Sequence, residues 1–270
     1  MEADLGEIFG YRPFYILSLG ITLGGLLIHS LKSFLNMILN RSNFSSFLLV
    51  IAAPLLIWAC SSAEPLAEQG PKRVLIETSF GEMILELSDS TPGHRDNFVK
   101  LVDEGFYDGL LFHRVIEDFM VQGGDPGSRG AKPGKRLGSG GPGYTLDAEI
   151  RADHLHTKGA LSAARQGDNV NPAKKSSGSQ FYLVQGKPQS QAQMRKTQRR
   201  VQSKAPEFEY TEDQLAKYAT AGGTPFLDME YTVFGYVVAG IDIIDSIAAV
   251  ETARGDRPVE DVIMNMRVIR

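Results

Sequence analysis

One arginine stands in an otherwise apolar stretch of this chain, and its position suggests chemistry rather than packing. The stretch runs from Phe112 to Pro126 and reads FHRVIEDFMVQGGDP. If it forms a strand, Phe112, Arg114 and Ile116 share one face, because side chains alternate along a strand. A guanidinium on an apolar face costs free energy unless a partner or a reaction uses it. Since it keeps its charge and presents a fixed fork of donors, it suits electrostatic stabilisation of a transition state in a dry pocket.

Two motifs of the chain resemble the signatures of the cyclophilin-type peptidyl-prolyl cis-trans isomerases. The first is the stretch around Arg114, and the second runs from Ser177 to Leu183 and reads SGSQFYL. They stand in the family's order, and the resemblance covers about residues 73–270. It implies a mainly β fold, a closed eight-stranded antiparallel barrel capped by two helices. It also implies an enzyme that isomerises X–Pro peptide bonds without a cofactor.

Such a reaction needs neither a nucleophile nor a proton relay. Rotation about an X–Pro bond is opposed by a barrier of about 18–20 kcal/mol, because the nitrogen lone pair is delocalised into the carbonyl. Uncatalysed exchange takes on the order of tens to hundreds of seconds. A catalyst must favour the twisted state, in which the nitrogen accepts a hydrogen bond. Each ~1.4 kcal/mol gained only in that state gives about tenfold in rate.

The resemblance also implies roles for individual residues. Arg114 is implied to be the catalytic arginine, and Gln122 to hold both the substrate backbone and the arginine. The alternative is a structural arginine paired with an acid such as Glu117 or Asp118. The residues implied to form the pocket for the proline ring are Phe119, Met120, Tyr182 and Leu227. Further substrate contacts are implied for His113 at the rim, Ala164, Arg165, Gln180, Phe226 and Tyr231.

Four of these positions depart from the residues that are common in the family. Tyr182 replaces a phenylalanine, so its hydroxyl could narrow the pocket or reach water at the rim. Arg165 stands where asparagine is frequent and adds a charge at the rim, although the implied contact there is mostly backbone. Phe226 stands where many eukaryotic members have tryptophan, which implies weak cyclosporin binding. Tyr231 stands where many members have histidine.

The composition argues against several other classes of protein. The formal net charge of −4 argues against a nucleic-acid partner. Cys60 is the only cysteine, so no intramolecular disulfide can form. The five histidines lack the spacing and acidic neighbours of a metal site, and none is predicted. The GxGxxG pattern at 138–143 is interpreted as a turn-rich loop, because Pro142 lies inside it and a strand pattern follows.

The first sixty residues are interpreted as a signal peptide or a membrane anchor. Two apolar runs, 13–28 and 44–59, precede the globular part, and the second leads into LIWACSS. This sequence resembles a bacterial lipoprotein cleavage site, in which Cys60 becomes lipidated. Because Ser61 rather than an aspartate follows, the resemblance favours an outer-membrane anchor. We therefore expect a membrane-anchored protein of the cell envelope that faces the periplasm.

The position of the true start decides between two forms of this segment. A start at Met37 leaves Arg41 as the basic region and 47–58 as the apolar core, which is shorter than the about 20 residues of a membrane span. The alternative is an anchor, or a two-helix hairpin, retained from Met1; two buried core helices are least favoured. Residues 61–72 are rich in small and polar residues and are predicted to be a flexible linker.

Alternating and periodic patterns outline the elements that position the motifs. Strands are predicted at 73–78 and 82–87, which form a hairpin, and at 159–164, 180–185, 231–238 and 262–269. One helix is predicted to open with Thr91 as its N-cap before Pro92 and to end at Gly105. A second helix is predicted over 242–249.

Residues 187–223 are longer than the connection that the family usually has here, and we interpret them as a helical insertion. Helical patterns cover 191–204 and 210–221, and residues 187–204 contain six basic and no acidic residues. The insertion could be a docking surface for an acidic client or an anionic lipid. The favoured interpretation is a solvated helical hairpin that covers one end of the barrel.

Three functions are compatible with these residues. The favoured one is isomerisation of X–Pro bonds in exported proteins, which assists their folding. The runner-up is a proline-peptide-binding module or holdase that uses the same groove with little turnover. A hydrolase is disfavoured, because the available serines (Ser162, Ser177 and Ser179) lack a GxSxG elbow and a matching histidine and aspartate.

Overall fold

The computed structural model describes residues 70–269. The predictions for the signal peptide or anchor, the start at Met37, the lipidated Cys60 and nearly all of the linker lie outside the described residues. None of the helices in the described range is both long and apolar enough to cross a membrane.

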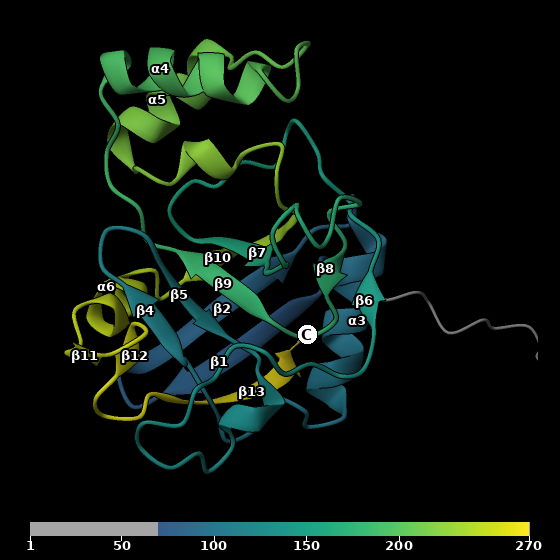
Figure 1. The fold of residues 1–270 in the computed structure, drawn as a ribbon, viewed down its shortest axis with the longest axis vertical. Helices are drawn as coiled ribbons and strands as arrows, with labels where there is room; N and C mark the ends of the chain where they lie inside the picture. The colour runs from purple at the N-terminus through teal and green to yellow at the C-terminus, as the bar shows by residue number, and fades with distance from the viewer. Residues whose placement is uncertain (1–69, 270) are drawn as a thin grey trace, which may run out of the picture. The chain divides into compact units, whose positions relative to one another are not determined.

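A curled antiparallel sheet of nine strands forms the body of the protein (Figure 1). The strands follow one another across the sheet in the order β3-β13-β1-β2-β10-β7-β9-β5-β4. Their bounds are β1 (Arg73–Thr78), β2 (Gly81–Leu87), β3 (Leu110–Leu111), β4 (Arg114–Ile116), β5 (Met120–Gly123), β7 (Ala160–Ala163), β9 (Phe181–Val184), β10 (Val233–Ala239) and β13 (Ile263–Ile269). The predicted hairpin is therefore present as β1 and β2.

The closed barrel of eight strands that we expected is not confirmed, because the hydrogen-bonded ladder is an open half-barrel. Its two edges are β3, which pairs with β13, and β4, which pairs with β5. Only Phe112 and His113 separate these two short strands in the chain. The Phe112 N–H donates to Val262 and the Val115 N–H to Asp256, so the chain changes partners between them. The covalent chain, rather than a ladder of hydrogen bonds, joins the two edges.

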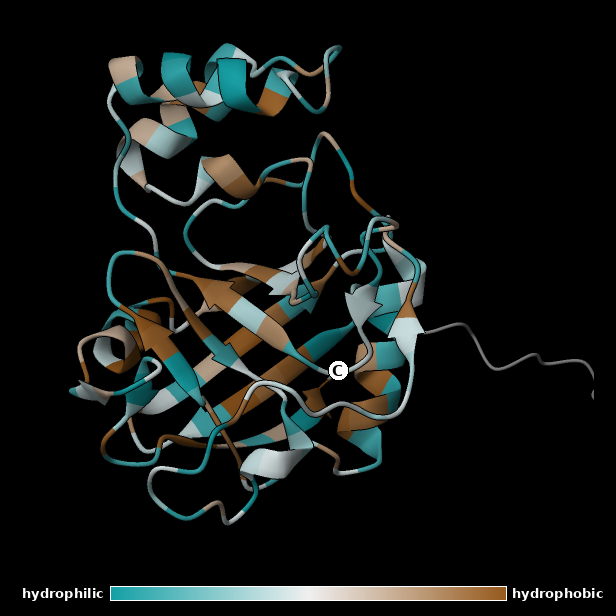
Figure 2. Cartoon of the chain, in the orientation of Figure 1, coloured by the Kyte–Doolittle hydropathy of each residue, from teal (hydrophilic) through white to brown (hydrophobic). Residues whose placement is uncertain are grey.

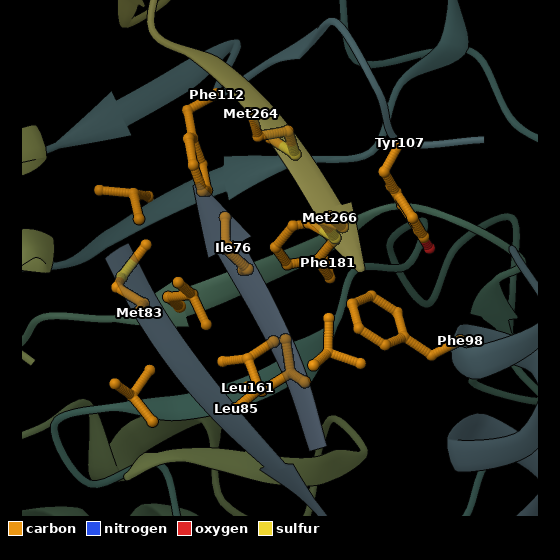
Figure 3. Packing of buried hydrophobic residues seen from close by; sticks show 14 of the residues in the cluster. Ile76, Met83, Leu85, Phe98, Tyr107, Phe112, Leu161, Phe181, Met264 and Met266 are labelled. Carbon is orange, nitrogen blue, oxygen red and sulfur yellow. The ribbon is translucent and has the colours of Figure 1, made fainter. Parts of the chain in front are cut away.

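The main core lies on the inner face of the curled sheet. Figure 3 shows side chains from β1, β2, β7, β9 and β13 packed together there. Phe98 and Tyr107 approach Phe181 edge-on, with ring centroids 5.6 Å and 5.8 Å from its ring. Each such side chain contributes about 1.5–3 kcal/mol through its burial. Figure 2 shows hydrophobic colour along the strands, whereas α4 (Gln191–Gln202) is mostly hydrophilic.

Four α-helices lie in the described part of the chain. Two of them, α3 (Pro92–Asp103) and α6 (Asp242–Ala248), pack against the sheet as predicted. The other two, α4 and α5 (Glu212–Thr220), lie together at one end of the domain (Figure 1), in the segment predicted to be a helical insertion. The short elements are the 3₁₀ turns η1 (Pro126–Ser128) and η2 (Pro225–Leu227) and the strand pairs β6 (Thr145–Leu146) with β8 (Ser176–Ser177) and β11 (Thr252–Ala253) with β12 (Arg257–Pro258).

The N-terminus of α3 is capped differently from our prediction. Thr91 precedes the helix, but its hydroxyl donates to Ser88 and makes no cap hydrogen bond. The carboxylate of Glu149, from a distant loop, instead accepts from the backbone N–H groups of Gly93 and His94. A negative charge at this position also interacts favourably with the helix dipole.

The two insertion helices have their own N-caps and their own small core. Ser190 and Gln193 form a reciprocal capping box at the start of α4, and Thr211 and Gln214 form another at the start of α5. Such caps satisfy backbone N–H groups that would otherwise lack partners. The buried side chains of this core are Leu155, Met194, Val201, Phe208, Tyr210 and Tyr218. The insertion is therefore a folded unit and not a loose loop.

Candidate active site

The sheet places the predicted arginine and glutamine opposite each other. Arg114 on β4 pairs in register with Gln122 on β5, and Gln122 in turn faces Tyr182 on β9. The Arg114 Nη1 atom donates to Gln122 Oε1 at 3.4 Å. Gln122 Nε2 donates to Gln180 Oε1 at 3.0 Å, and Gln180 Nε2 donates to the Gly140 carbonyl at 2.7 Å. This chain of amides orients the arginine.

Asp256 is the acidic partner of Arg114. The Arg114 Nε atom lies 3.3 Å from Asp256 Oδ2, on the turn between β11 and β12, and both side chains are nearly half exposed. The acids considered from the sequence, Glu117 and Asp118, do not take this place, and Asp118 pairs with Lys187 at 2.7 Å. An exposed ion pair contributes only about 0–1 kcal/mol. A substrate can therefore compete with Asp256 for the guanidinium at low cost.

All four residues predicted to hold the proline ring gather in one apolar cluster beside this arginine. Met120 and Tyr182 are buried in it, and Phe119, Ala164, Leu227 and Tyr231 are partly buried against them. Phe226 on η2 lies at its edge, with its ring centroid 5.7 Å from that of Phe119. The structure thus brings together side chains from four separate segments of the chain, next to a charged donor.

The hydroxyl of Tyr182 neither narrows an open pocket nor reaches water. Tyr182 is 5% exposed, and its hydroxyl lies 3.0 Å from Nε2 of His156, which is fully buried. The rings of Tyr182 and His156 stack with an interplanar angle of 14°. Burial raises the pKa of Tyr182 well above its ordinary value, so the hydroxyl keeps its proton. The tyrosine is thus part of a buried polar network.

Asp228 is the centre of this network and joins it to the insertion. Its Oδ1 atom accepts from the backbone N–H and the Nδ1 atom of His156, at 2.9 Å and 2.8 Å. Its Oδ2 atom accepts from the hydroxyls of Tyr210 and Tyr218, at 2.7 Å and 2.6 Å. Burial raises the pKa of both tyrosines, which keeps them as donors. Because Asp228 directly follows η2, the network also fixes the turn that carries Phe226 and Leu227.

The charge of Arg165 is not free at the rim, contrary to our expectation. Its side chain is 4% exposed and donates to Glu230 at 3.1 Å and to Asp168 at 2.6 Å. Its guanidinium lies 4.5 Å from the centre of the Tyr231 ring. Ion pairing and stacking therefore hold this side chain against the protein.

The backbone of Arg165 remains available, whereas that of Ala164 does not. The Ala164 N–H donates to Gln180 and its carbonyl accepts from Ser177. No hydrogen bond within residues 70–269 uses the N–H or the carbonyl of Arg165. This agrees with the backbone contact that the resemblance implies for Arg165 and limits Ala164 to a side-chain contact.

Two predicted substrate contacts are buried in the structure. His113 is 3% exposed and neither ring nitrogen has a hydrogen-bond partner among the described residues, so the ring does not lie at an open rim. Burial lowers its pKa, although Asp125 acts in the opposite direction. Gln180 is 7% exposed and its amide is engaged with Gln122 and Gly140. Gln180 is thus placed to orient Gln122, whereas no hydrogen bond among the described residues gives the His113 ring such a role.

The glycine-rich loop binds a carboxylate of its own chain. Asp125 Oδ1 accepts from the Gly127 N–H at 2.7 Å, and Asp125 Oδ2 accepts from the N–H groups of Gly138 and Gly140. These backbone N–H donors are therefore already used. Although burial opposes it, these hydrogen bonds lower the pKa of Asp125. The GxGxxG pattern is therefore part of a loop that the carboxylate of Asp125 holds in place.

The serines available to a hydrolase have structural surroundings. Ser162 is fully buried, and Ser177 Oγ accepts from the backbone N–H groups of Ser179 and Gln180. The Ser179 hydroxyl donates to the Gly124 carbonyl. Among the described residues, no group of three or more His, Cys, Asp or Glu side chains could hold a metal ion.

Comparison with known proteins identifies the family. A family model described as cyclophilin type peptidyl-prolyl cis-trans isomerase/CLD matches residues 73–268. The chain belongs to this family. It is therefore a cyclophilin-type peptidyl-prolyl cis-trans isomerase, a class of enzyme that acts without a cofactor.

Two curated relatives support the assignment. A protein of Staphylococcus aureus, named for peptidyl-prolyl cis-trans isomerase activity, is 33% identical over 198 residues, which are 73% of this cyclophilin and 91% of that protein. A Streptococcus pyogenes protein, named as a bifunctional phosphatase and peptidyl-prolyl cis-trans isomerase, is 40% identical over 208 residues. That match covers 72% of this chain but 38% of the Streptococcus protein, so the chain spans little more than a third of that relative.

Solved structures show the same fold. A cyclophilin type peptidyl-prolyl cis-trans isomerase of Cryptosporidium parvum has a TM-score of 0.52 and 22% identity, and the match covers 74% of this chain and 99% of that chain. The same Cryptosporidium protein was also solved in the presence of the dipeptide Ala-Pro, with a TM-score of 0.50, 22% identity, and coverage of 73% and 99%.

Several residues of this cyclophilin's site were missed from the sequence. His156, Asp228 and Asp256 stand in loops, and no periodic pattern or motif marks them as partners of the predicted residues. The only local signal was the phenylalanine-to-tyrosine departure at position 182, since a buried hydroxyl requires a polar partner. The individual roles of the site residues remain predictions.

We predict that Asp228→Ala destabilises the protein by about 3–5 kcal/mol, because it leaves buried donors on His156 and Tyr218 without an acceptor. Asp245→Ala is the matched control. Asp245 pairs with Lys158, but its side chain is 46% exposed, so its loss costs about 1 kcal/mol or less. Urea unfolding followed by circular dichroism measures both. Equal losses would contradict a structural role for the network.

We also predict that stability falls as the pH is lowered from 6.5, the ordinary pKa of histidine. Burial lowers the pKa values of His94 and His113, so in this range the unfolded chain binds protons that the folded chain does not. The free energy of unfolding then decreases by up to about 1.4 kcal/mol per pH unit for each histidine. In His113→Leu the slope between pH 6.5 and 5 becomes shallower. A slope parallel to that of the parent protein would refute the assignment to His113.

Proposed function

We propose that the chain catalyses cis–trans isomerisation of X–Pro bonds in exported proteins and thereby assists their folding. The observation that carries this proposal is the position of Arg114, whose donors lie beside the apolar cluster of Met120, Tyr182 and Leu227. A proline ring seated in that cluster brings its nitrogen toward a charged donor.

In the proposed mechanism, each group of the site has its own role. The apolar cluster binds the ring, and the unused backbone groups of Arg165 pair with the extended substrate chain. Gln122 orients Arg114, which exchanges its contact with Asp256 for the substrate. As the bond twists and the proline nitrogen becomes pyramidal, the guanidinium donates a hydrogen bond to it. This contact exists only in the twisted state, so it lowers the barrier.

A second candidate is a proline-peptide-binding module or holdase with little turnover. The observation behind this alternative is the ion pair between Arg114 and Asp256, which a substrate must displace before the guanidinium can act in catalysis. The two candidates share the groove and differ only in whether bound prolines exchange faster than in water.

We further propose that the protein is anchored in the cell envelope and faces the periplasm. The support is the sequence LIWACSS, in which Cys60 would carry a lipid that holds the domain at the outer membrane. A retained N-terminal membrane helix is the alternative anchor. We also propose weak cyclosporin binding, because Phe226 stands where many eukaryotic members have tryptophan.

We predict that Arg114→Ala lowers kcat/KM of the full chain for an X–Pro peptide by about a hundredfold or more, because the charged donor is lost. Protease-coupled isomerisation measures the rate. Arg254→Ala, an exposed arginine on the β11–β12 turn, is the control and leaves the rate unchanged. A folded parent protein that binds the peptide without exchange above background would favour the binding module.

We predict that Cys60→Ser releases the protein from the membrane fraction of a bacterial host, because a serine cannot be lipidated. Fractionation and metabolic labelling with a fatty acid would show both effects. Unchanged membrane association without label in the parent protein would favour the retained helix.

A further inference from the structure

The six basic residues of 187–204 divide into two groups. Lys187 pairs with Asp118 at 2.7 Å, and Lys204 pairs with Glu230 at 2.8 Å. The other four have no carboxylate partner within residues 70–269 and are exposed on α4; they are Arg195, Lys196, Arg199 and Arg200. Ion pairs within residues 70–269 therefore do not account for these four charges.

Arg200 differs from the other three in its position relative to the proline pocket. Its guanidinium carbon lies 5.6 Å from the centre of the Phe226 ring. Phe226 is 37% exposed, and its ring centroid lies 5.7 Å from that of Phe119. Arg200 is thus separated from the predicted pocket by a single aromatic ring, which a substrate can also touch.

A cluster of ion pairs that includes Lys204, four residues from Arg200 in the chain, has more cations than carboxylates. Glu230 pairs with Arg165, Lys174 and Lys204, and Asp168 also lies within 4 Å of Arg165 and Lys204. These three cations outnumber the two carboxylates before Arg200 is counted. Arg200 adds a further positive charge beside Phe226, which increases the positive potential there.

Arg195 and Arg199 face elsewhere. They line a groove between α4 and α5 together with Glu209 and Glu212, whereas Arg200 does not. Five residues along a helix correspond to a rotation of about 140°, which puts Arg195 and Arg200 on different faces of α4. One helix thus carries two exposed arginines, of which only Arg200 contacts an aromatic ring of the predicted site.

We propose that Arg200 is a specificity-determining residue that favours substrates with an aspartate or glutamate close to the isomerised proline. The inference rests on the proposed isomerase function and adds the chemistry of the preferred substrate. A carboxylate near the proline meets the guanidinium above Phe226, where the protein offers it no competing partner. An exposed ion pair of this kind contributes modestly, so the preference is about two- to fivefold in kcat/KM.

The test compares peptides that differ only in the residues flanking one X–Pro bond, with Glu, Gln or Lys at those positions. Exchange rates are measured by NMR exchange spectroscopy, which needs no protease, on the full chain and on two variants. Arg200→Glu reverses the charge beside the pocket. Arg195→Glu makes the same change on another face of α4 and is the matched control.

The parent protein is expected to isomerise the Glu peptide about two- to fivefold faster than the Lys peptide at low substrate concentration. Arg200→Glu abolishes or reverses this ratio, Arg195→Glu keeps it, and high salt reduces it because the contact is exposed. Isomerisation of the Gln peptide by all three proteins shows that the variants are folded and active.

Equal rates for the three peptides with the parent protein would overturn the proposal while leaving the isomerase function intact. No exchange above background for any peptide would instead refute the proposed function itself. Anionic phosphatidylglycerol vesicles provide a further arm. The proposal would be overturned if both variants bound these vesicles equally weakly and the parent protein showed no peptide preference. The charges of α4 would then be assigned to a membrane surface.

Discussion

The register of β4, β5 and β9 is the constraint on which the rest of the site depends. It places Arg114, Gln122 and Tyr182 in consecutive positions across three strands. Because the side-chain period of a strand is two residues, a slip of one residue in any of these strands would turn its member of the trio to the opposite face. The buried residues between them, Val115 and Val121, fix that register by pointing into the core. Packing on one face of the sheet therefore determines the chemistry on the other.

The insertion is integrated with the groove through buried polar contacts rather than by an apolar interface alone. Tyr210 and Tyr218 reach Asp228, and Asp228 reaches Tyr182 through His156. A carboxylate that is 1% exposed is stable here because four donors surround it. Polar contacts of this kind have strict geometry, so they orient the η2 turn more narrowly than apolar packing would.

Local sequence patterns predicted the elements, and the family motifs predicted which side chains would meet. The β1–β2 hairpin and α6 follow from alternation and periodicity, and all four residues predicted to hold the proline ring lie in one cluster. Contacts between distant loops were not predictable. Asp256 lies 142 residues from Arg114, and Asp228 lies 72 residues from His156. Glu149 took the place of the expected Thr91 cap from 55 residues away. Such partners have no periodic signal, since only the completed fold brings them together.

The four hydrogen bonds to Asp228 also limit how this chain can change in length. Deleting residues 187–223 would remove two of these donors, Tyr210 and Tyr218, and leave Asp228 Oδ2 without its hydroxyl partners. A shortened cyclophilin of this lineage would need a compensating replacement at position 228 and, with His156 altered, a phenylalanine at position 182. Loss of the insertion is therefore not a single evolutionary step but a coordinated set of changes at sites far apart in the gene.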